Sequence, residues 1–296
     1  MRGLRDWVRD AVERGRRGSE ALGQLLRTAS SVTVAPAGPY AGHSLYAASV
    51  MNSLGVNAVA VDDLMLNYYI APYDEGRERP VVVFASPTGL TELNILLDQL
   101  RWTGHELVVA SPTPLPEVIR SKLEGVTFID LGPGEGPWLL ASLVTVALAV
   151  SGAGKGPEVR LSRLSEEVLT LEEVIDDLIA HYDSVLKDLA LFIREPHIVT
   201  ATPTLWVVAE ALTYSRDIKA RRFLVRPSAV SEVVRFVNRV LVVQTDVEDF
   251  SLRHIKSLAL TAATKFAELR IRTDPLTAPL YGLILVKVIE GLAREA

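Results

Sequence analysis

The stretch that decides the fold is residues 81–93, which read VVVFASPTGLTEL. The apolar residues 81–85 are typical of a strand that is buried on both faces. Helical spacing begins at Leu90 and predicts a helix over 90–103. The turn between this strand and helix therefore lies at the carboxyl end of a buried strand, where open parallel sheets bind their ligands.

Short apolar strands alternate with helical stretches along the rest of the chain. Strands are predicted at 31–38, 57–63, 81–86, 106–111, 126–131, 197–204, 221–227, within 239–251, and at 267–271. Helices are predicted at 2–28, 44–53, 90–103, 115–123, 137–150, 166–192, 205–214, after the strand within 239–251, and at 279–293. Because the strands are apolar on both faces and separated by helices, the pattern predicts an α/β fold with parallel sheets covered on both sides, a three-layer αβα arrangement.

The second half of the chain repeats the order of the first. GPWLLASLVTVALAV (136–150) and APLYGLILVKVIEGLA (278–293) each start with a helix-entry proline that precedes an aromatic residue and a long apolar helix. The two copies lie roughly 140 to 165 residues apart, which indicates a duplicated α/β domain. The Gly-rich segment SGAGKGPE (151–158) is the expected boundary between the copies. The predicted parts are an N-terminal helix (1–28), a first domain (29–152) and a second domain (153–296).

Composition excludes several classes of function. The chain has 296 residues, of which 49% are hydrophobic, and this is enough for a large core. The net charge is −5 and no long run of Lys or Arg occurs, so no nucleic-acid partner is expected. The absence of cysteine excludes disulfides, thiolate zinc sites and cysteine nucleophiles. Because His43, His105, His181 and His197 are scattered, no metal site is predicted.

Nothing in the sequence indicates a membrane protein. The N-terminal residues 1–18 are charged throughout and lack the apolar core of a signal peptide. The longest apolar run, 138–150, is too short to span a bilayer and is typical of a buried helix. We therefore expect a soluble, cytoplasmic protein. Glutamine occurs only at Gln24, Gln99 and Gln244, and such avoidance of thermolabile side chains indicates a thermophilic source.

Two loops of the first domain are candidates for a ligand site, 35–44 and 86–91, because both lead from a strand into a helix. Backbone N–H groups and the helix dipole attract an anion at such a place. In the second loop the hydroxyls of Ser86, Thr88 and Thr91 are further donors, and Gly89 lets the backbone approach a ligand closely. The alternative is that Thr88 or Thr91 only caps the helix.

The order of the elements and the loop Ser86-Pro87-Thr88-Gly89-Leu90-Thr91 resemble the sugar isomerase (SIS) domain family. From about residue 30 the layout is similar to that of the tandem-SIS phosphoglucose/phosphomannose isomerases of archaea. Members of the family hold the phosphate of a sugar on a Ser-x-Ser-Gly-x-Thr loop. The resemblance implies two SIS domains and a sugar-phosphate site at Ser86, Thr88, Gly89 and Thr91.

The first loop departs from the family pattern, in which a Gly-Met-Gly-Gly-Ser-Gly type of turn occurs. Here residues 35–42 read APAGPYAG, and its two prolines lack the N–H that would bind an anion. Ser44 or His43 is expected to compensate in part, and Ser44 is assigned to the phosphate site.

The resemblance also implies a catalytic pair in the second domain. Alignment from residue 197 places Asp217 on the family's glutamate base, although Asp is shorter by one methylene and proton transfer needs atoms within about 3 Å. The family's ring-opening histidine has no counterpart in sequence, and His254 is the only later histidine. The alternatives are that Asp217 pairs with Lys219 or Arg221 and that His254 is a surface or interface histidine.

Two functions remain open on this basis. The first is an aldose–ketose phosphate isomerase that follows an enediol route, with Asp217 as base and His254 as second group, and this route needs no cofactor or metal. The second is a phosphosugar-binding or regulatory protein without catalysis. SGAGKG lacks the spacing of a nucleotide-binding Walker loop and is expected to be a linker. A homodimer is predicted, because the apolar helices 137–150 and 279–293 either pack the two halves or build an interface.

Overall fold

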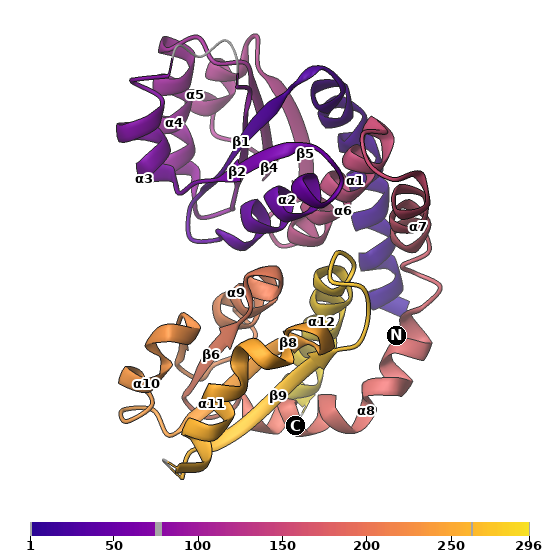
Figure 1. The fold of residues 1–296 in the computed structure, drawn as a ribbon, viewed down its shortest axis with the longest axis vertical. Coiled ribbons are helices and arrows are strands. Elements are labelled where there is room, and N and C mark those ends of the chain that lie inside the picture. Colours follow the sequence, from indigo (N-terminus) through magenta and orange to yellow (C-terminus); the bar gives the residue numbers. More distant parts are fainter. Residues whose placement is uncertain (1, 75–78, 262, 296) are drawn as a thin grey trace. The chain divides into compact units, whose positions relative to one another are not determined.

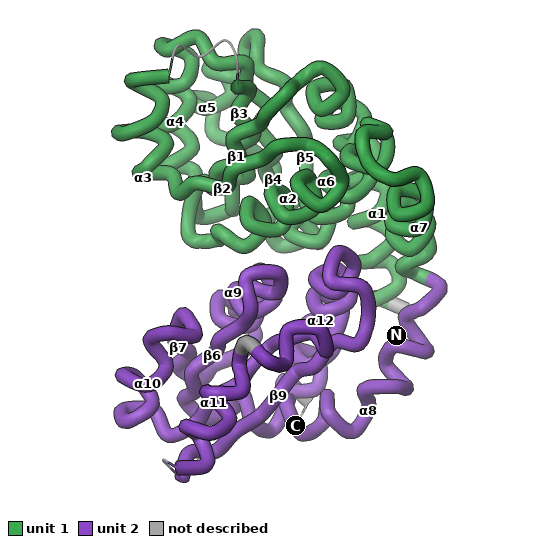
Figure 2. Tube along the Cα trace, viewed as in Figure 1, with its two compact units in different colours: residues 1–172 green, residues 173–296 purple. Residues whose placement is uncertain are grey.

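The computed structural model describes residues 2–74, 79–261 and 263–295. It divides into two compact units, unit 1 with residues 1–172 and unit 2 with residues 173–296 (Figure 2). Each unit is an α/β body with one parallel sheet flanked by helices, which confirms the predicted fold class (Figure 1).

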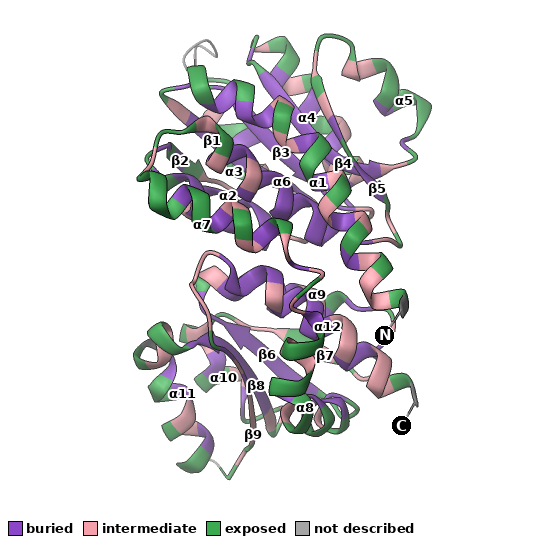
Figure 3. Cartoon of the chain, turned by 90° about the vertical axis from the view of Figure 1, so that its right-hand side faces the viewer, coloured by how far each residue is buried: buried purple, intermediate pink, exposed green. Residues whose placement is uncertain are grey.

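The sheet of unit 1 has five parallel strands in the order β2-β1-β3-β4-β5. The strands are β1 (Ser31–Ala37), β2 (Asn57–Ala60), β3 (Val81–Ala85), β4 (Leu107–Thr113) and β5 (Thr127–Pro133). Every residue of β3 is buried, as expected for a central strand with helices on both faces (Figure 3). The apolar run 81–85 is thus the middle of the sheet.

Pro36 lies in the central strand β1, although proline cannot donate a hydrogen bond to a neighbouring strand. The N–H of Thr33 points toward β3 and donates to Pro80 O, so the N–H of every second residue from Thr33 points the same way. Pro36 faces the other side, toward β2. The β2 ladder ends at the pair Val34–Ala60, and Val61 N donates to Val34 O just beyond it. The proline is tolerated because no strand stands opposite its missing N–H.

Helices cover both faces of this sheet. The helical elements of unit 1 are α1 (Arg2–Thr28), α2 (Gly42–Ser53), α3 (Asp63–Met65), the π-helix η1 (Leu66–Ile70), α4 (Leu90–Trp102), α5 (Glu117–Arg120), the 3-10 turn η2 (Ser121–Leu123), α6 (Trp138–Ala153) and α7 (Glu158–Leu169). Right-handed crossovers leave β1 and β3 in opposite directions, and they therefore place α2 and α4 on opposite faces.

Two glycines let α1 pack closely on its neighbours. A Cβ at Gly15 would lie 2.4 Å from Cγ1 of Val144 on α6, and one at Gly18 would lie 2.5 Å from Cγ2 of Ile129 on β5. The apolar helix α6 is therefore buried under α1, which confirms that the run 138–150 is a buried helix. On the other face, α4 buries Leu93, Leu96, Leu97 and Leu100 at helical spacing. Each such leucine contributes about 2 kcal/mol of apolar burial.

Unit 2 has a four-stranded parallel sheet in the order β7-β6-β8-β9. Its strands are β6 (His197–Ala201), β7 (Arg222–Leu224), β8 (Arg239–Thr245) and β9 (Lys265–Ile271). Its helical elements are α8 (Ile175–Phe192), η3 (Pro203–Leu205), α9 (Trp206–Tyr214), η4 (Pro227–Ala229), α10 (Val230–Val233), η5 (Asp246–Glu248), α11 (Asp249–Thr261) and α12 (Ala278–Glu295). In unit 1, α5 and β5 stand between β4 and the long helix α6, whereas in unit 2 the long helix α12 follows β9 directly.

The single helix predicted at 166–192 is wrong. The structure has two helices there, α7 and α8, with a turn between them. Leu161, Leu164 and Val168 of α7 are buried, and α7 contacts α6. Unit 1 therefore extends through α7, past the boundary predicted at 152. Gly154, with φ +70°, ends α6 in the left-handed conformation that glycine adopts without strain.

Candidate functional site

Two loops of unit 1 meet where the strand order reverses. In the order β2-β1-β3-β4-β5 the chain leaves β1 toward one edge of the sheet and β3 toward the other, so the switch point lies between β1 and β3. The N–H of Ser86 donates to Ala37 O at 3.0 Å. Both loops that the sequence singled out, 35–44 and 86–91, thus lie at the place where doubly wound sheets bind ligands.

The two loops approach so closely that only glycine fits at their contact. A Cβ at Gly89 would lie 1.9 Å from Ala37 O, and one at Gly38 would lie 2.4 Å from Ser86 Oγ. Gly38 also has φ +100°, which disfavours any side chain. Bare backbone therefore forms the floor of the switch point.

The hydroxyls of the second loop differ in exposure. Ser86 is fully buried, whereas Thr88 and Thr91 are exposed. Ser86 Oγ lies 3.3 Å from Thr88 Oγ1, so the buried serine orients the exposed threonine. Gly89 is the N-cap of α4, and no side chain accepts a hydrogen bond from the first turn. The alternative in which Thr88 or Thr91 caps the helix does not describe the structure.

Carboxylates border this turn on one side. Glu92 is in the first turn of α4, and its buried Oε2 has no hydrogen-bond partner in the described part of the chain. Burial raises the pKa of Asp63, and the neighbouring Asp62 and Glu92 add to that rise, while local backbone hydrogen bonds oppose it. An anion on this side of α4 would be repelled by these carboxylates.

His43 and Ser44 stand in the first turn of α2, and both are buried. The Nε2 of His43 lies 3.1 Å from Phe84 O, so this nitrogen carries the proton and donates it. Burial lowers the pKa of His43 to about 3, and the ring is therefore neutral at physiological pH. The ring centroid lies 5.2 Å from that of Phe84 and 6.1 Å from that of Trp138. Ser44 Oγ has no hydrogen-bond partner among the described residues.

Asp217 lies between α9 and β7, and its carboxylate is ion-paired. Its Oδ2 is 2.6 Å from Nη2 of Arg294 and 3.7 Å from Nζ of Lys287, both on α12. These partners replace the expected Lys219 and Arg221, because α12 packs against α9 and brings its cations to that end of the helix. The carboxylate is therefore engaged by two cations of α12.

His254 lies on α11 and is exposed. Right-handed crossovers from β6 and β8 run in opposite directions, so α9 and α11 cover opposite faces of the unit 2 sheet. Asp217 follows α9 and binds α12, which contacts α9. Unit 2 therefore does not bring Asp217 and His254 together.

Unit 2 has a switch point of its own, between β6 and β8, and sequence reasoning missed what fills it. Thr202 Oγ1 donates to Glu248 Oε2 at 2.7 Å, and Thr245 Oγ1 donates to the same oxygen at 2.8 Å. Thr245 and Glu248 form a capping box at the start of η5. The spacing Thr-x-x-Glu at 245–248 was the available signal.

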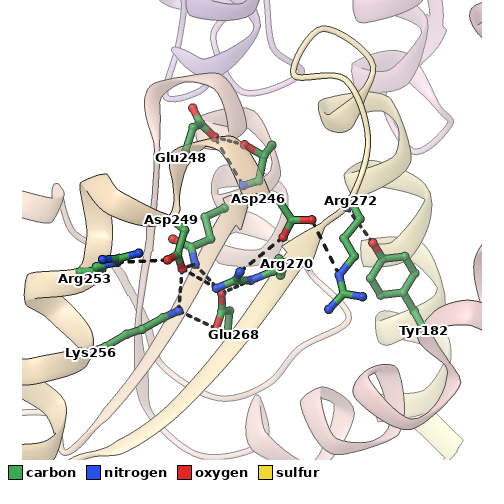
Figure 4. A network of polar contacts seen from close by, with 11 residues as sticks. Tyr182, Asp246, Glu248, Asp249, Arg253, Lys256, Glu268, Arg270 and Arg272 are labelled. Carbon is green, nitrogen blue, oxygen red and sulfur yellow. Dashed lines mark hydrogen bonds and ion pairs between the residues drawn. The ribbon is translucent and has the colours of Figure 1, made fainter.

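Beside Glu248, a network of charged side chains joins β8, β9 and α11 (Figure 4). Arg270 pairs with Glu268, Asp249 and Asp246, and Lys256 pairs with Asp249 and Glu268. Hydrogen bonds, first from Lys256, hold the pKa of Asp249 far below its usual value. Burial would raise the pKa of Glu268, but hydrogen bonds from Arg270, Gln244 and Lys256 outweigh it and lower that pKa. These carboxylates stay ionised and hold the carboxyl end of β9 to α11.

Within the described ranges, no three side chains of the His, Asp and Glu types gather in a way that would hold a metal ion. None of the helices traced through those residues is both long enough and apolar enough to cross a membrane.

Comparison with protein-family models gives no match, and comparison with curated proteins gives none either. Solved structures match over nearly the whole chain. The C-terminal domain of glucosamine-fructose-6-phosphate aminotransferase from Francisella tularensis has a TM-score of 0.66 at 9% identity, covering 97% of this chain and 94% of that one. Glucosamine-6-phosphate deaminase from Thermotoga maritima has a TM-score of 0.62 at 14% identity, covering 97% and 94%.

A protein from Clostridium difficile 630, provisionally assigned as a phosphosugar isomerase, has a TM-score of 0.69 at 10% identity. The match covers 99% of this chain and 92% of that one. At such identities the likeness concerns the fold. The chain therefore shares the fold of these solved structures, and in this chain that fold has two parallel sheets flanked by helices.

Proposed function

We propose that the chain binds a sugar phosphate, with its phosphate at the switch point of unit 1. The observation that supports this most directly is the contact of Gly38 with Ser86 and Gly89 beside the uncapped start of α4. Bare backbone, a helix N-terminus and the exposed hydroxyls of Thr88 and Thr91 form a set of donors that suits a phosphate.

Each predicted phosphate residue has a different part in this proposal. Thr88 and Thr91 contact the phosphate directly, because they are exposed. Ser86 positions Thr88 through the 3.3 Å contact between their hydroxyls. Gly89 keeps the backbone accessible. Ser44 is buried, so its contact with a phosphate requires a displacement of the loop that precedes α2.

An isomerase activity is the finer form of this proposal, and the geometry of unit 2 argues against its simplest version. An enediol route needs an acid–base group beside the sugar carbons, whereas Asp217 is held by Arg294 and Lys287, and His254 lies on the other face of the sheet. A binding or regulatory role therefore fits better than turnover by Asp217 and His254.

A thermal-shift screen with hexose and ketose phosphates, paired with an isomerase assay, tests the proposal. Binding to the native state raises the melting temperature, because it stabilises that state by RT ln(1 + [L]/Kd). We expect stabilisation by a phosphosugar, little by the unphosphorylated sugar, and loss of most of the shift in Thr88→Val. Thr261→Val removes an exposed helix hydroxyl of unit 2 and is the matched control. No shift with any phosphosugar would refute the proposal.

Two variants separate the finer points. Ser44→Ala removes a hydroxyl that has no partner, so the free protein should keep its melting temperature while the ligand-induced shift falls. An unchanged ligand shift would remove Ser44 from the site. Isomerase turnover that survives Asp217→Ala would exclude Asp217 as the base. Turnover that is present in the wild type and lost in Asp217→Ala would support an isomerase with Asp217 as its base.

We also propose a homodimer, and the mass in solution tests it. The burial of α6 under α1 makes this helix a core element of unit 1, so the predicted interface through 137–150 would have to involve another surface. A monomeric mass at micromolar concentration would contradict the proposal.

A further inference from the structure

The two switch points of the chain are bridged in different ways. In unit 1 the loops touch through backbone, since a Cβ at Gly38 would lie 2.7 Å from the Cα of Gly89. The corresponding loops of unit 2, 201–205 and 243–249, contain no glycine. They are joined by side chains instead, because Thr202 after β6 and Glu248 after β8 share a hydrogen bond of 2.7 Å.

The surroundings of Glu248 Oε2 are those of a bound oxyanion. One hydroxyl donor comes from each loop, Thr202 Oγ1 at 2.7 Å and Thr245 Oγ1 at 2.8 Å, and Thr245 N adds a longer contact of 3.4 Å. The carboxylate also stands at the start of the helical segment formed by η5 and α11, where the helix dipole favours negative charge. The start of a helix at a switch point is also where other doubly wound sheets hold a phosphate group.

We infer that the Glu248 carboxylate is the built-in anion of the second switch point and excludes a ligand phosphate from unit 2. The chain then takes one phosphate, in unit 1. The location in unit 1 rests on the proposed function, whereas the exclusion from unit 2 rests on the contacts of Glu248 alone.

The charges around Glu248 indicate what its removal would do. Three other carboxylates stand in the neighbouring network, and four cations pair with them. The carboxylates are Asp246, Asp249 and Glu268, and the cations are Arg253, Lys256, Arg270 and Arg272. Without Glu248 the cluster therefore carries one net positive charge, while the hydroxyls of Thr202 and Thr245 lose their acceptor. An added oxyanion then finds donors and a favourable field.

Titration of the full ¹⁵N-labelled chain with inorganic phosphate, followed by amide chemical shifts, tests the inference. Sodium chloride at matched ionic strength is the control for screening. In the wild type we expect saturable shifts at 38–44 and 86–92 and none at 202–205 and 245–249. In Glu248→Ala we expect a second set of saturable shifts at 202–205 and 245–249.

Glu248→Gln is the matched variant, because its amide oxygen still accepts from both threonines. We expect no saturable shifts at 202–205 and 245–249 in this variant, as in the wild type. Saturable shifts at 245–249 in the wild type, or their absence in a folded Glu248→Ala, would overturn the inference. The wild-type titration decides the exclusion even if Glu248→Ala does not fold. If Glu248→Ala shows saturable shifts at 202–205 and 245–249 but residues 38–44 and 86–92 show none, the proposed function is refuted and the inference is supported.

Discussion

At the scale of single residues, the site in unit 1 depends on two positions where a side chain would not fit. Gly89 and Gly38 have no Cβ, and the loops after β1 and β3 touch because of it. His43 and Ser44, next to these loops, each carry a buried polar atom that has no partner within the described ranges. Such atoms cost free energy in the empty protein, and they are expected where a ligand or a water completes their hydrogen bonds.

Gly89→Ala should destabilise unit 1 and abolish phosphosugar binding. The new Cβ would lie 1.9 Å from Ala37 O, so the two loops have to move apart. Strain of this kind costs about 1–3 kcal/mol. Urea unfolding and the thermal-shift assay measure both effects.

Gly152→Ala is the control for that change, because a Cβ at Gly152 meets nothing within 4 Å and the residue lies in α6. There we expect a gain of about 0.5–1 kcal/mol. Equal binding by Gly89→Ala and the wild type would contradict the role of this backbone contact.

His43 should make the free energy of unfolding depend on pH below neutrality. Its pKa is about 3 in the folded protein and about 6.5 in the unfolded chain. The unfolded chain therefore binds a proton that the native state refuses, so stability is complete above about pH 6.5 and falls as the pH drops toward 3. At pH 5 the loss from this group should be about 2 kcal/mol.

His43→Gln provides the comparison, because its amide can still donate to Phe84 O and does not titrate. Urea unfolding at pH 7.5, 6 and 5 should give a flatter profile for this variant than for the wild type. Parallel profiles would mean that His43 is protonated in the native state.

At the scale of elements, the two units differ in how the helix at the switch point begins. Helix α4 begins without a side-chain cap, whereas the segment of η5 and α11 begins with a capping box. In unit 2 the elements η5, β9 and α11 are held together by the network around Arg270. The two units therefore differ at their switch points. The start of α4 in unit 1 has no side-chain cap, whereas the start of η5 in unit 2 is capped by Thr245 and Glu248.

Arg270→Met should destabilise unit 2, because it leaves Asp249 and Glu268 with fewer donors. Hydrogen bonds to charged groups contribute roughly 2 kcal/mol each, and we expect a total loss of this order since other partners remain. Arg253→Met is the matched control: its side chain is 66% exposed, and its ion pair among the described residues is with Asp249 in the same helix. A change of about 0.5 kcal/mol or less is expected there. Equal losses in urea unfolding would show that the network does not act through Arg270.

At the scale of the whole molecule, the chain is two compact α/β units that share the order of their first four strands. The first retains a fifth strand, β5, and the second ends its sheet at β9. Helix α7 belongs to the first unit, because its apolar side packs on α6.

A fragment of residues 1–172 should unfold cooperatively, whereas 1–152 should be less stable by roughly 5 kcal/mol. The shorter fragment lacks Leu161, Leu164 and Val168, and each buried side chain of this kind contributes about 1.5–3 kcal/mol. Denaturant unfolding of the two fragments measures the difference. Equal stability would place the functional boundary at 152, as the Gly-rich segment suggests.

The sequence by itself determined the α/β class, the parallel sheets and the position of the Ser86–Thr91 loop. Apolar runs such as 81–85 and a turn residue such as Gly89 are local signals, because strand burial and turn geometry are set by neighbours in the chain. The helix 166–192 was misjudged since a continuous helical spacing hides a turn between two helices that share a buried side.

Only the tertiary structure decided which side chains meet. Asp217 binds Arg294 and Lys287 on a helix far along the chain, and Glu248 joins Thr202 across the sheet. His254 falls on the opposite face because the hand of the crossovers fixes it there. Such pairings depend on how elements pack and on strand order, and these are properties of the folded chain that local spacing does not encode.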